Sequence, residues 1–257
     1  MPVPIVTLTT DFGLSDHYVG VMKGVILGIC PNAQLVDIAH QVSRYAIAEG
    51  AFLLGQVYPH FPPGTVHLAV IDPGVGSPRR PIVVEAAGQY FVGPDNGVFG
   101  MVFASEQHRV RLIQNRQYIL RLLSHTFHGR DLFAPVAAHL ATGVEPAQIG
   151  ESIDNYIRRS FESPRKTGDG RWTGEILKVD HFGNAITNFR TADFPAFRTM
   201  TLGNAEVRRQ VHSYAEAEPG ELVAINGSSG YLEVSLNQGS AAEKIGCSGG
   251  DPCYLWV

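Results

Sequence analysis

Two charged side chains flank a flexible turn in the segment VIDPGVGSPRR. Asp72 follows a run of β-branched residues, and Arg79 returns seven residues later, after two glycines. One interpretation is a structural turn closed by a surface ion pair. The other is a carboxylate whose pKa and orientation are set by the nearby guanidinium. The spacing alone leaves both interpretations open.

A histidine and two further carboxylates stand where expected elements begin or end. In TFHGRD, His128 precedes a helix expected to begin near Asp131, and a helix N-terminus favours neutral imidazole. The alternative is a loop histidine beside a helix cap. In TTDFGLSDHYVG, Asp16 is placed to cap the following helix. Asp11 follows a strand, where a carboxylate can accept hydrogen bonds from ribose hydroxyls.

Two polar turns occur in the second half of the chain. VDHFGNAITN holds Asp180, Phe182 and Asn184, a combination that suits a small amphiphilic ligand. It is equally compatible with a β-turn in which Gly183 and Asn184 are left-handed. NGSSGY, residues 226–231, is either an amide nest for a carboxylate or a flexible hairpin.

The elements that must position these residues alternate between strand and helix in the first half. Strands are expected at Val3–Leu8, Leu35–Ala39, Thr65–Ile71 and Pro81–Glu85, and helices at Tyr18–Cys30, Arg44–Tyr58 and Asp131–Thr142. The alternation predicts a parallel-sheet α/β domain with helices on both faces. Ligands bind beyond the carboxyl ends of such strands, where Asp11 and Asp72 lie.

Helical periodicity disappears in the second half. Short strands are expected there at Glu175–Val179, Leu222–Ile225, Tyr231–Ser235 and Cys253–Val257. They predict a smaller C-terminal domain that is a β-barrel or a β-sandwich. The resulting division is an N-terminal domain at residues 1–160, a linker rich in Gly and Pro at 161–171, and the barrel at 172–257.

Composition excludes several classes of function. The formal net charge of −4 gives no basic excess for nucleic acid, and no apolar run reaches the roughly 18 residues of a membrane span. The N-terminus lacks signal-peptide features, so we expect a cytoplasmic protein. Cys30, Cys247 and Cys253 are too scattered for a disulfide framework or a closed zinc site. A metal-dependent hydrolase is disfavoured because no HExxH motif occurs.

Seven motifs occur together in one order: TTDFG, ICPNAQLVDIAHQV, DPGVGS, GPDNG, TFHGRD, DHFGN and SSGY. In this the chain resembles the S-adenosyl-L-methionine (SAM) hydroxide adenosyltransferases, or SAM hydrolases, which are relatives of the fluorinases and chlorinases. The resemblance implies that SAM is hydrolysed to adenosine and L-methionine by attack of water at ribose C5′, with no metal or cofactor. It also implies a homotrimer whose active sites lie between the N-terminal domain of one subunit and the C-terminal domain of the next.

The same resemblance assigns roles to residues. Asp72, Arg79 and His128 match the catalytic set of the hydrolases, and Asp11 matches a ribose-holding carboxylate. The other residues that it places at the substrate are Asp16, Tyr45, Asp180, Phe182, Asn184, Ser228 and Tyr231. A catalytically idle protein that binds nucleosides or SAM on the same fold is the alternative. The joint presence of the three reactive residues favours the enzyme.

Overall fold

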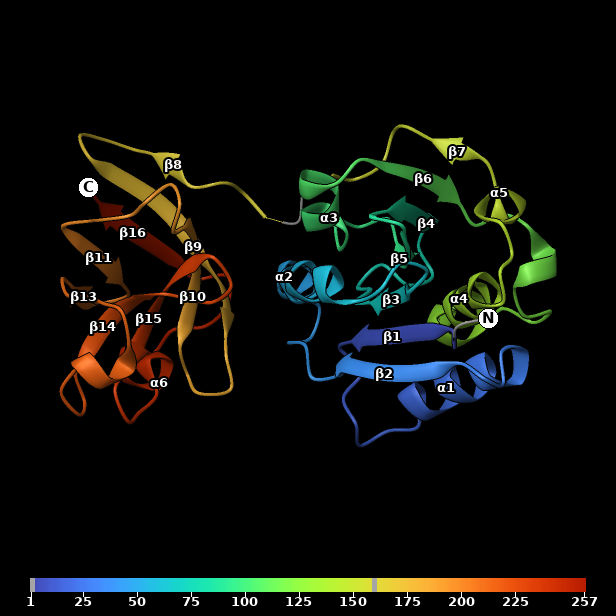
Figure 1. Cartoon of the computed structure of the whole chain (residues 1–257), viewed down its shortest axis with the longest axis horizontal. Helices are drawn as coiled ribbons and strands as arrows, with labels where there is room; N and C mark the ends of the chain where they lie inside the picture. Colours follow the sequence, from blue (N-terminus) through green and yellow to red (C-terminus); the bar gives the residue numbers. More distant parts are fainter. Residues whose placement is uncertain (1–2, 159–160) are drawn as a thin grey trace. The chain divides into compact units, whose positions relative to one another are not determined.

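The computed structural model describes residues 3–158 and 161–257 of the chain. The chain divides into two compact units, Met1–Ser160 and Phe161–Val257, called here the first and the second unit. Figure 1 shows helices and strands mixed in the first unit and mainly strands in the second. The protein is therefore a mixed α/β protein, as predicted. The predicted end of the first domain, residue 160, lies outside the described residues.

Seven strands form the sheet of the first unit, in the order β2-β1-β3-β5-β4-β6-β7. Their bounds are Ile5–Thr10 (β1), Gln34–Ala39 (β2), Val66–Val70 (β3), Pro81–Ala86 (β4), Gln89–Pro94 (β5), His108–Leu112 (β6) and Ser152–Ile153 (β7). Neighbours from β2 to β5 are parallel, whereas β4, β6 and β7 pair antiparallel. Only Ala87 and Gly88, both with positive φ, connect β4 to β5, and so short a turn requires antiparallel strands. The prediction of a parallel sheet is correct from β2 to β5 and wrong beyond β5.

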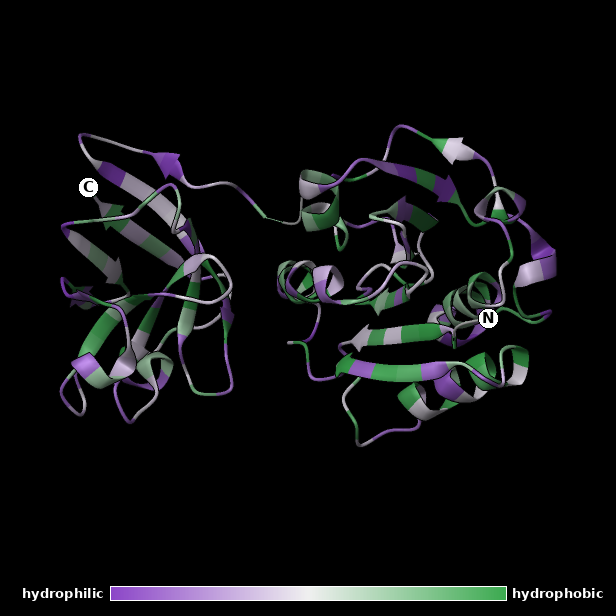
Figure 2. Cartoon of the chain, in the orientation of Figure 1, coloured by the Kyte–Doolittle hydropathy of each residue, from purple (hydrophilic) through white to green (hydrophobic). Residues whose placement is uncertain are grey.

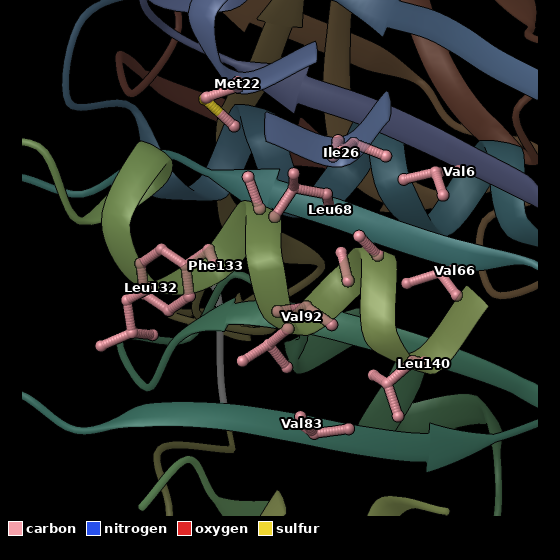
Figure 3. Close-up of a cluster of buried hydrophobic side chains, with 14 of the residues drawn as sticks. Val6, Met22, Ile26, Val66, Leu68, Val83, Val92, Leu132, Phe133 and Leu140 are labelled. Carbon is pink, nitrogen blue, oxygen red and sulfur yellow. The ribbon is translucent and has the colours of Figure 1, made fainter. Parts of the chain in front are cut away.

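Helices cover both faces of this sheet. Their bounds are Tyr18–Ile29 (α1), Ile47–Val57 (α2), Gly100–Ser105 (α3), Ala134–Ala141 (α4) and Pro146–Ile149 (α5). Successive strand residues point to opposite faces, so Leu68 joins the core with α1 and α4 while Ala69 joins the core with α2 and α3. Figure 3 shows the first of these cores, in which Met22 and Ile26 of α1 lie with Leu68.

One sheet of nine strands forms most of the second unit. Its order is β12-β11-β16-β9-β10-β15-β14-β13, and β8 also pairs with β9. The bounds are Arg165–Lys166 (β8), Arg171–Val179 (β9), Ala185–Arg190 (β10), Thr199–Leu202 (β11), Ala205–Val207 (β12), Gln210–Val211 (β13), Leu222–Asn226 (β14), Tyr231–Leu236 (β15) and Pro252–Trp256 (β16). Irregular register in the pairs of β10 with β9 and β15 bends the sheet.

Two sequence predictions for this unit need correction. The end strands β12 and β13 have three and two residues and do not pair with each other within residues 161–257, so the sheet is open rather than a closed barrel. Residues 161–171, expected as a linker, belong to the second unit and contain β8, which is hydrogen-bonded to β9. Gly and Pro in that stretch mark turns between β8 and its neighbours, and the division between the two units falls at its start.

Hydrophobic residues predominate along some of the strands, as along β1 and β14 in Figure 2. This matches the separate cores of the two units. Across the part of the chain that the structure describes, each helix is too short or too polar to span a lipid bilayer.

Candidate active site

Arg79 bridges Asp72 and His128. Its Nε lies 3.0 Å from both carboxylate oxygens of Asp72, and its Nη2 lies 2.5 Å from Oδ2. The same Nη2 is 2.7 Å from Nδ1 of His128. The side chains of Asp72 and Arg79 are only 4% and 9% exposed, so bulk solvent screens this ion pair weakly. The three residues predicted as the catalytic set therefore form one hydrogen-bonded group.

The bridge fixes the protonation of His128. A guanidinium can only donate, so Nδ1 of His128 accepts, and the proton of the neutral ring is on Nε2. Burial and the positive charge of Arg79 both lower the pKa of His128, against a smaller opposite effect of Asp72. At neutral pH His128 is thus a neutral imidazole that can donate a hydrogen bond through Nε2.

The glycine-rich turn places Asp72 and Arg79 against the segment that carries His128. Gly76 has a φ of 77°, and a Cβ atom there would lie 2.6 Å from the carbonyl oxygen of His125. Any side chain at this position would push the turn away from the His125 backbone. Within the turn, Oγ of Ser77 accepts from the backbone N–H of Arg79 at 3.2 Å. The close approach explains why glycine occupies position 76.

His128 precedes a π-helical turn, η3 (Gly129–Phe133), that continues into α4. The sequence predicted an ordinary helix starting near Asp131. Asp131 instead lies within the π-helical turn. Its side chain is fully buried and accepts hydrogen bonds from Arg130 and from the backbone N–H of Ser124. The ring of Phe133 lies 5.2 Å from the guanidinium carbon of Arg79. Such π-helical turns occur often at functional sites.

A cavity of about 340 Å³ opens beside this segment. It is lined by Phe12, His17, Tyr18, Ser124, Thr126, Phe127 and Arg130. Three aromatic rings meet along its wall: the centroid of the Tyr18 ring lies 5.1 Å from that of Phe127, edge to face, and 5.8 Å from that of Phe12, in a tilted arrangement. The guanidinium carbon of Arg130, which also lines the cavity, lies 5.2 Å from the centroid of the Phe127 ring, so a cation already contacts this aromatic wall.

Asp11 and Tyr45, both predicted at the substrate, are in contact. Oδ2 of Asp11 accepts from the backbone N–H of Tyr45 at 2.9 Å. Tyr45 has a φ of 66° and is 68% exposed. Asp16 is exposed, and α1 has His17 at its N-cap with no side-chain cap bond. The interpretation of Asp16 as a helix cap is therefore wrong.

In the second unit, Asp180 organises the turn that carries Phe182 and Asn184. Its Oδ1 accepts from the backbone N–H groups of Phe182 and Asn184, both at 2.9 Å. Its Oδ2 accepts from Nδ2 of Asn184, also at 2.9 Å. Gly183 is left-handed with a φ of 84°, whereas Asn184 is not among the residues with positive φ. The β-turn interpretation is confirmed at Gly183 and wrong at Asn184.

A cavity of about 500 Å³ adjoins this turn. Its lining residues are Phe182, Asn184, Tyr214, Leu236, Asn237, Gln238 and Gly239. Phe182 is 75% exposed, and the Tyr214 hydroxyl donates to Oε1 of buried Glu233 at 2.6 Å. Burial and this carboxylate raise the pKa of Tyr214 to about 12. The sequence predicted Phe182 and Asn184 but missed Tyr214 and Gln238, which only the packing of distant segments brings to the cavity.

The NGSSGY segment forms a tight hairpin between β14 and β15. The backbone N–H of Gly227 donates to Tyr231 O, and that of Gly230 donates to Gly227 O. Ser228 is exposed on this turn, while Tyr231 is only 8% exposed. Residues 3–158 and 161–257 contain no group of three or more His, Cys, Asp or Glu side chains arranged to hold a metal ion.

Both units match models of one family. Residues 6–150 match the SAM hydroxide adenosyltransferase N-terminal domain, and residues 174–254 match the C-terminal domain of the same family. The chain belongs to the SAM hydroxide adenosyltransferase family.

Individual relatives agree over nearly the whole chain. The (R)-S-adenosyl-L-methionine hydrolase of Salinispora tropica is 38% identical over 256 residues, covering 97% of each chain. A fluorinase of Nocardia brasiliensis is 26% identical over 93% of this chain and 92% of its own. The crystal structure of an uncharacterized conserved protein from Thermotoga maritima matches with a TM-score of 0.89 and 35% identity, covering 98% of this chain and all of that one.

Proposed function

We propose that this protein hydrolyses SAM to adenosine and L-methionine. The observation that carries the proposal is the bridged group in which Arg79 contacts both Asp72 and His128. Relatives named as SAM hydrolases, matched over nearly full length, support the same reaction.

The reaction is a displacement at ribose C5′. The oxygen of a water molecule forms a bond to C5′ while the C5′–S bond breaks. The electron pair of the C5′–S bond stays on sulfur, which becomes the neutral thioether of methionine. One proton of the water must leave. A sulfonium is already a good leaving group, so the chemistry requires no metal, cofactor or general acid at sulfur. The protein must position and partly deprotonate water, and alignment at about 3–3.5 Å can recover several kcal/mol of the barrier.

Asp72 is the base in this proposal. Its Oδ2 accepts two hydrogen bonds from Arg79, whereas Oδ1 accepts one, which leaves Oδ1 with capacity for a proton from water. Nε2–H of His128 donates to the water oxygen and stabilises hydroxide character as it develops. Arg79 orients both groups. An anionic carboxylate at this point repels halide ions but accepts a proton from water, which favours hydroxide transfer over halogenation.

In this proposal, predicted residues of the first unit and predicted residues of the second unit each bind a part of the substrate. Asp11 accepts from the ribose hydroxyls next to the exposed ring of Tyr45, and Asp16, Asp180 and Ser228 serve the methionine end. The 500 Å³ cavity is our candidate for adenine, because Phe182 offers a ring face there and Asn184 an amide. Tyr231 is buried, so we propose that it supports the SSGY turn by packing rather than by contact with the substrate.

From the family resemblance we also propose a cytoplasmic homotrimer with active sites shared between subunits. Light scattering of the purified protein measures the assembly directly. A monomer with full activity would contradict this part of the proposal.

The direct test is incubation of the purified protein with SAM and chromatography of the products. We expect adenosine and methionine in equal amounts, and a loss of both with Asp72→Asn. A catalytically idle binding protein would return SAM unchanged while still binding it in calorimetry. Activity that disappears with a chelator and returns with added metal would instead indicate a metal-dependent hydrolase.

A further inference from the structure

A chain of polar side chains runs from the surface of the first unit to the loop that carries Asp11. Lys23 Nζ lies 2.6 Å from Asp37 Oδ2, and Nε2 of His40 lies 3.0 Å from Asp37 Oδ1. Nδ1 of His40 is 2.9 Å from Oγ1 of Thr10. The side chain of His40 is only 2% exposed, and Thr10 is fully buried. The mechanism proposed above uses none of these four residues.

The partners determine which atom donates in each link. The Asp37 carboxylate only accepts, so Nε2–H of His40 donates to it, and in the tautomer that carries its single proton on Nε2 the Nδ1 atom is an acceptor. The hydroxyl of Thr10 therefore donates to Nδ1. Its oxygen remains free to accept from the backbone N–H of Phe12, at 3.4 Å. All these bonds point the same way, from the loop towards the Asp37 carboxylate.

The chain ends on the residues that follow Asp11. Thr10 accepts from the N–H of Phe12, and the carbonyl oxygen of His40 accepts from the N–H of Gly13 at 2.7 Å. Two successive backbone amides after Asp11 are thus tied to His40, one through Thr10 and one directly. Gly13 has a φ of 72°, which lets the chain turn at this point. On its other side, Asp11 accepts from the backbone of Tyr45.

A buried chain of this kind is costly unless every member is satisfied, and apolar side chains could fill the same space. The hydrogen bonds of the polar chain, unlike apolar packing, fix the position of the backbone of residues 11–13. The register of β1 against β2 also shifts between Leu8 and Thr9, directly before the loop, and such irregularities re-aim a side chain. We propose that Thr10 and His40 are positioning residues that hold Asp11 for the ribose of the substrate, an inference that rests on the function proposed above.

The test compares Thr10→Val with a matched control, Thr65→Val. Both threonines are buried at β-strands of the same sheet, but Thr65 donates to the carbonyl oxygen of Pro62 and has no link to the Asp11 loop. Each substitution keeps the side-chain shape and removes one buried hydroxyl. Thr10→Ser restores the hydroxyl, and Thr10→Ala serves as the second variant if Thr10→Val does not fold. The readouts are the KM and kcat for SAM, the Kd for adenosine by calorimetry, and the Tm.

Loss of the hydroxyl should raise KM and the adenosine Kd roughly five- to tenfold, with kcat within about twofold. Thr10→Ser should return both constants to wild-type values, and Thr65→Val should lower Tm without changing either. Equal KM and Kd in Thr10→Val and wild type would overturn the inference, as would a change in KM of the same size in Thr65→Val. Wild-type protein that releases no adenosine from SAM contradicts the proposed function instead, and adenosine calorimetry then still decides whether Thr10 positions the loop.

Discussion

Replacement of Arg79 by lysine isolates the effect of the bridge from the effect of charge. Arg79 makes three close contacts to Asp72 and one to His128 from a single planar group. A lysine ammonium keeps the positive charge beside the buried carboxylate but is a compact point charge without the guanidinium fork. It cannot donate to Asp72 and His128 in the same geometry. Because Nδ1 of His128 then loses its fixed donor, the proton is no longer confined to Nε2.

We expect Arg79→Lys to lower kcat about 100-fold or more, since a misplaced donor at developing charge costs about 2.7–4 kcal/mol. KM for SAM should change less than about threefold, because Arg79 has no proposed substrate contact. The matched control is Arg80→Lys, in which the neighbouring arginine loses a comparable fork to the buried carboxylate of Asp95. Steady-state kinetics at saturating SAM measure the difference, and nitrogen NMR of His128 reports the tautomer. Equal losses of kcat in the two variants, or a normal kcat in Arg79→Lys, would refute the bridging role.

Three further predictions follow from the described residues. Asp11→Asn should weaken adenosine binding by about 1.5–3 kcal/mol in calorimetry, whereas Asp72→Asn should depress kcat with a smaller effect on binding; the reverse pattern contradicts the assignment of roles. Burial lowers the pKa of His67 to about 4 from 6.5, so the unfolded chain binds this proton first as the pH falls. The contribution of His67 to the free energy of unfolding is therefore fully present above pH 6.5. Towards pH 4 the free energy of unfolding should drop by up to about 3 kcal/mol in denaturant titrations. A His67→Gln variant with the same pH dependence shows that another group is responsible. Gly76→Ala should lower both Tm and kcat, because its Cβ meets the His125 carbonyl oxygen in a left-handed backbone; unchanged kcat would mean that the close approach does not place Arg79.

The sequence predicted the first-unit elements well where the signal was local. A helix was expected at Tyr18–Cys30, and α1 ends at Ile29 because Pro31 follows soon after. The second helix was expected from Arg44 but α2 begins at Ile47, since Tyr45 takes a left-handed conformation and its N–H is bound to Asp11. No local pattern reports that long-range contact. The direction of β4 was missed for a different reason, because the two-residue turn at Ala87 was not recognised.

The candidate site was predictable only through the joint order of motifs. Asp72 and Arg79 are close in sequence, so their spacing suggested a pair, but His128 lies 49 residues beyond Arg79. Periodicity carries no information on such a distance. Tyr214 was missed because nothing in its own segment distinguishes a cavity residue from a surface tyrosine. The tautomer of His128 likewise follows from which atom faces Arg79, and that is a property of the folded chain alone.

The most direct measurement of the central claim is the reaction of SAM in oxygen-18 water. If water polarised by the Asp72, Arg79 and His128 group attacks C5′, the label appears in the 5′-hydroxyl of adenosine and methionine stays unlabelled. Added chloride should then yield little or no 5′-chloro-5′-deoxyadenosine. Unlabelled adenosine, label in methionine, or a halogenated nucleoside as the main product would contradict hydroxide transfer by this protein.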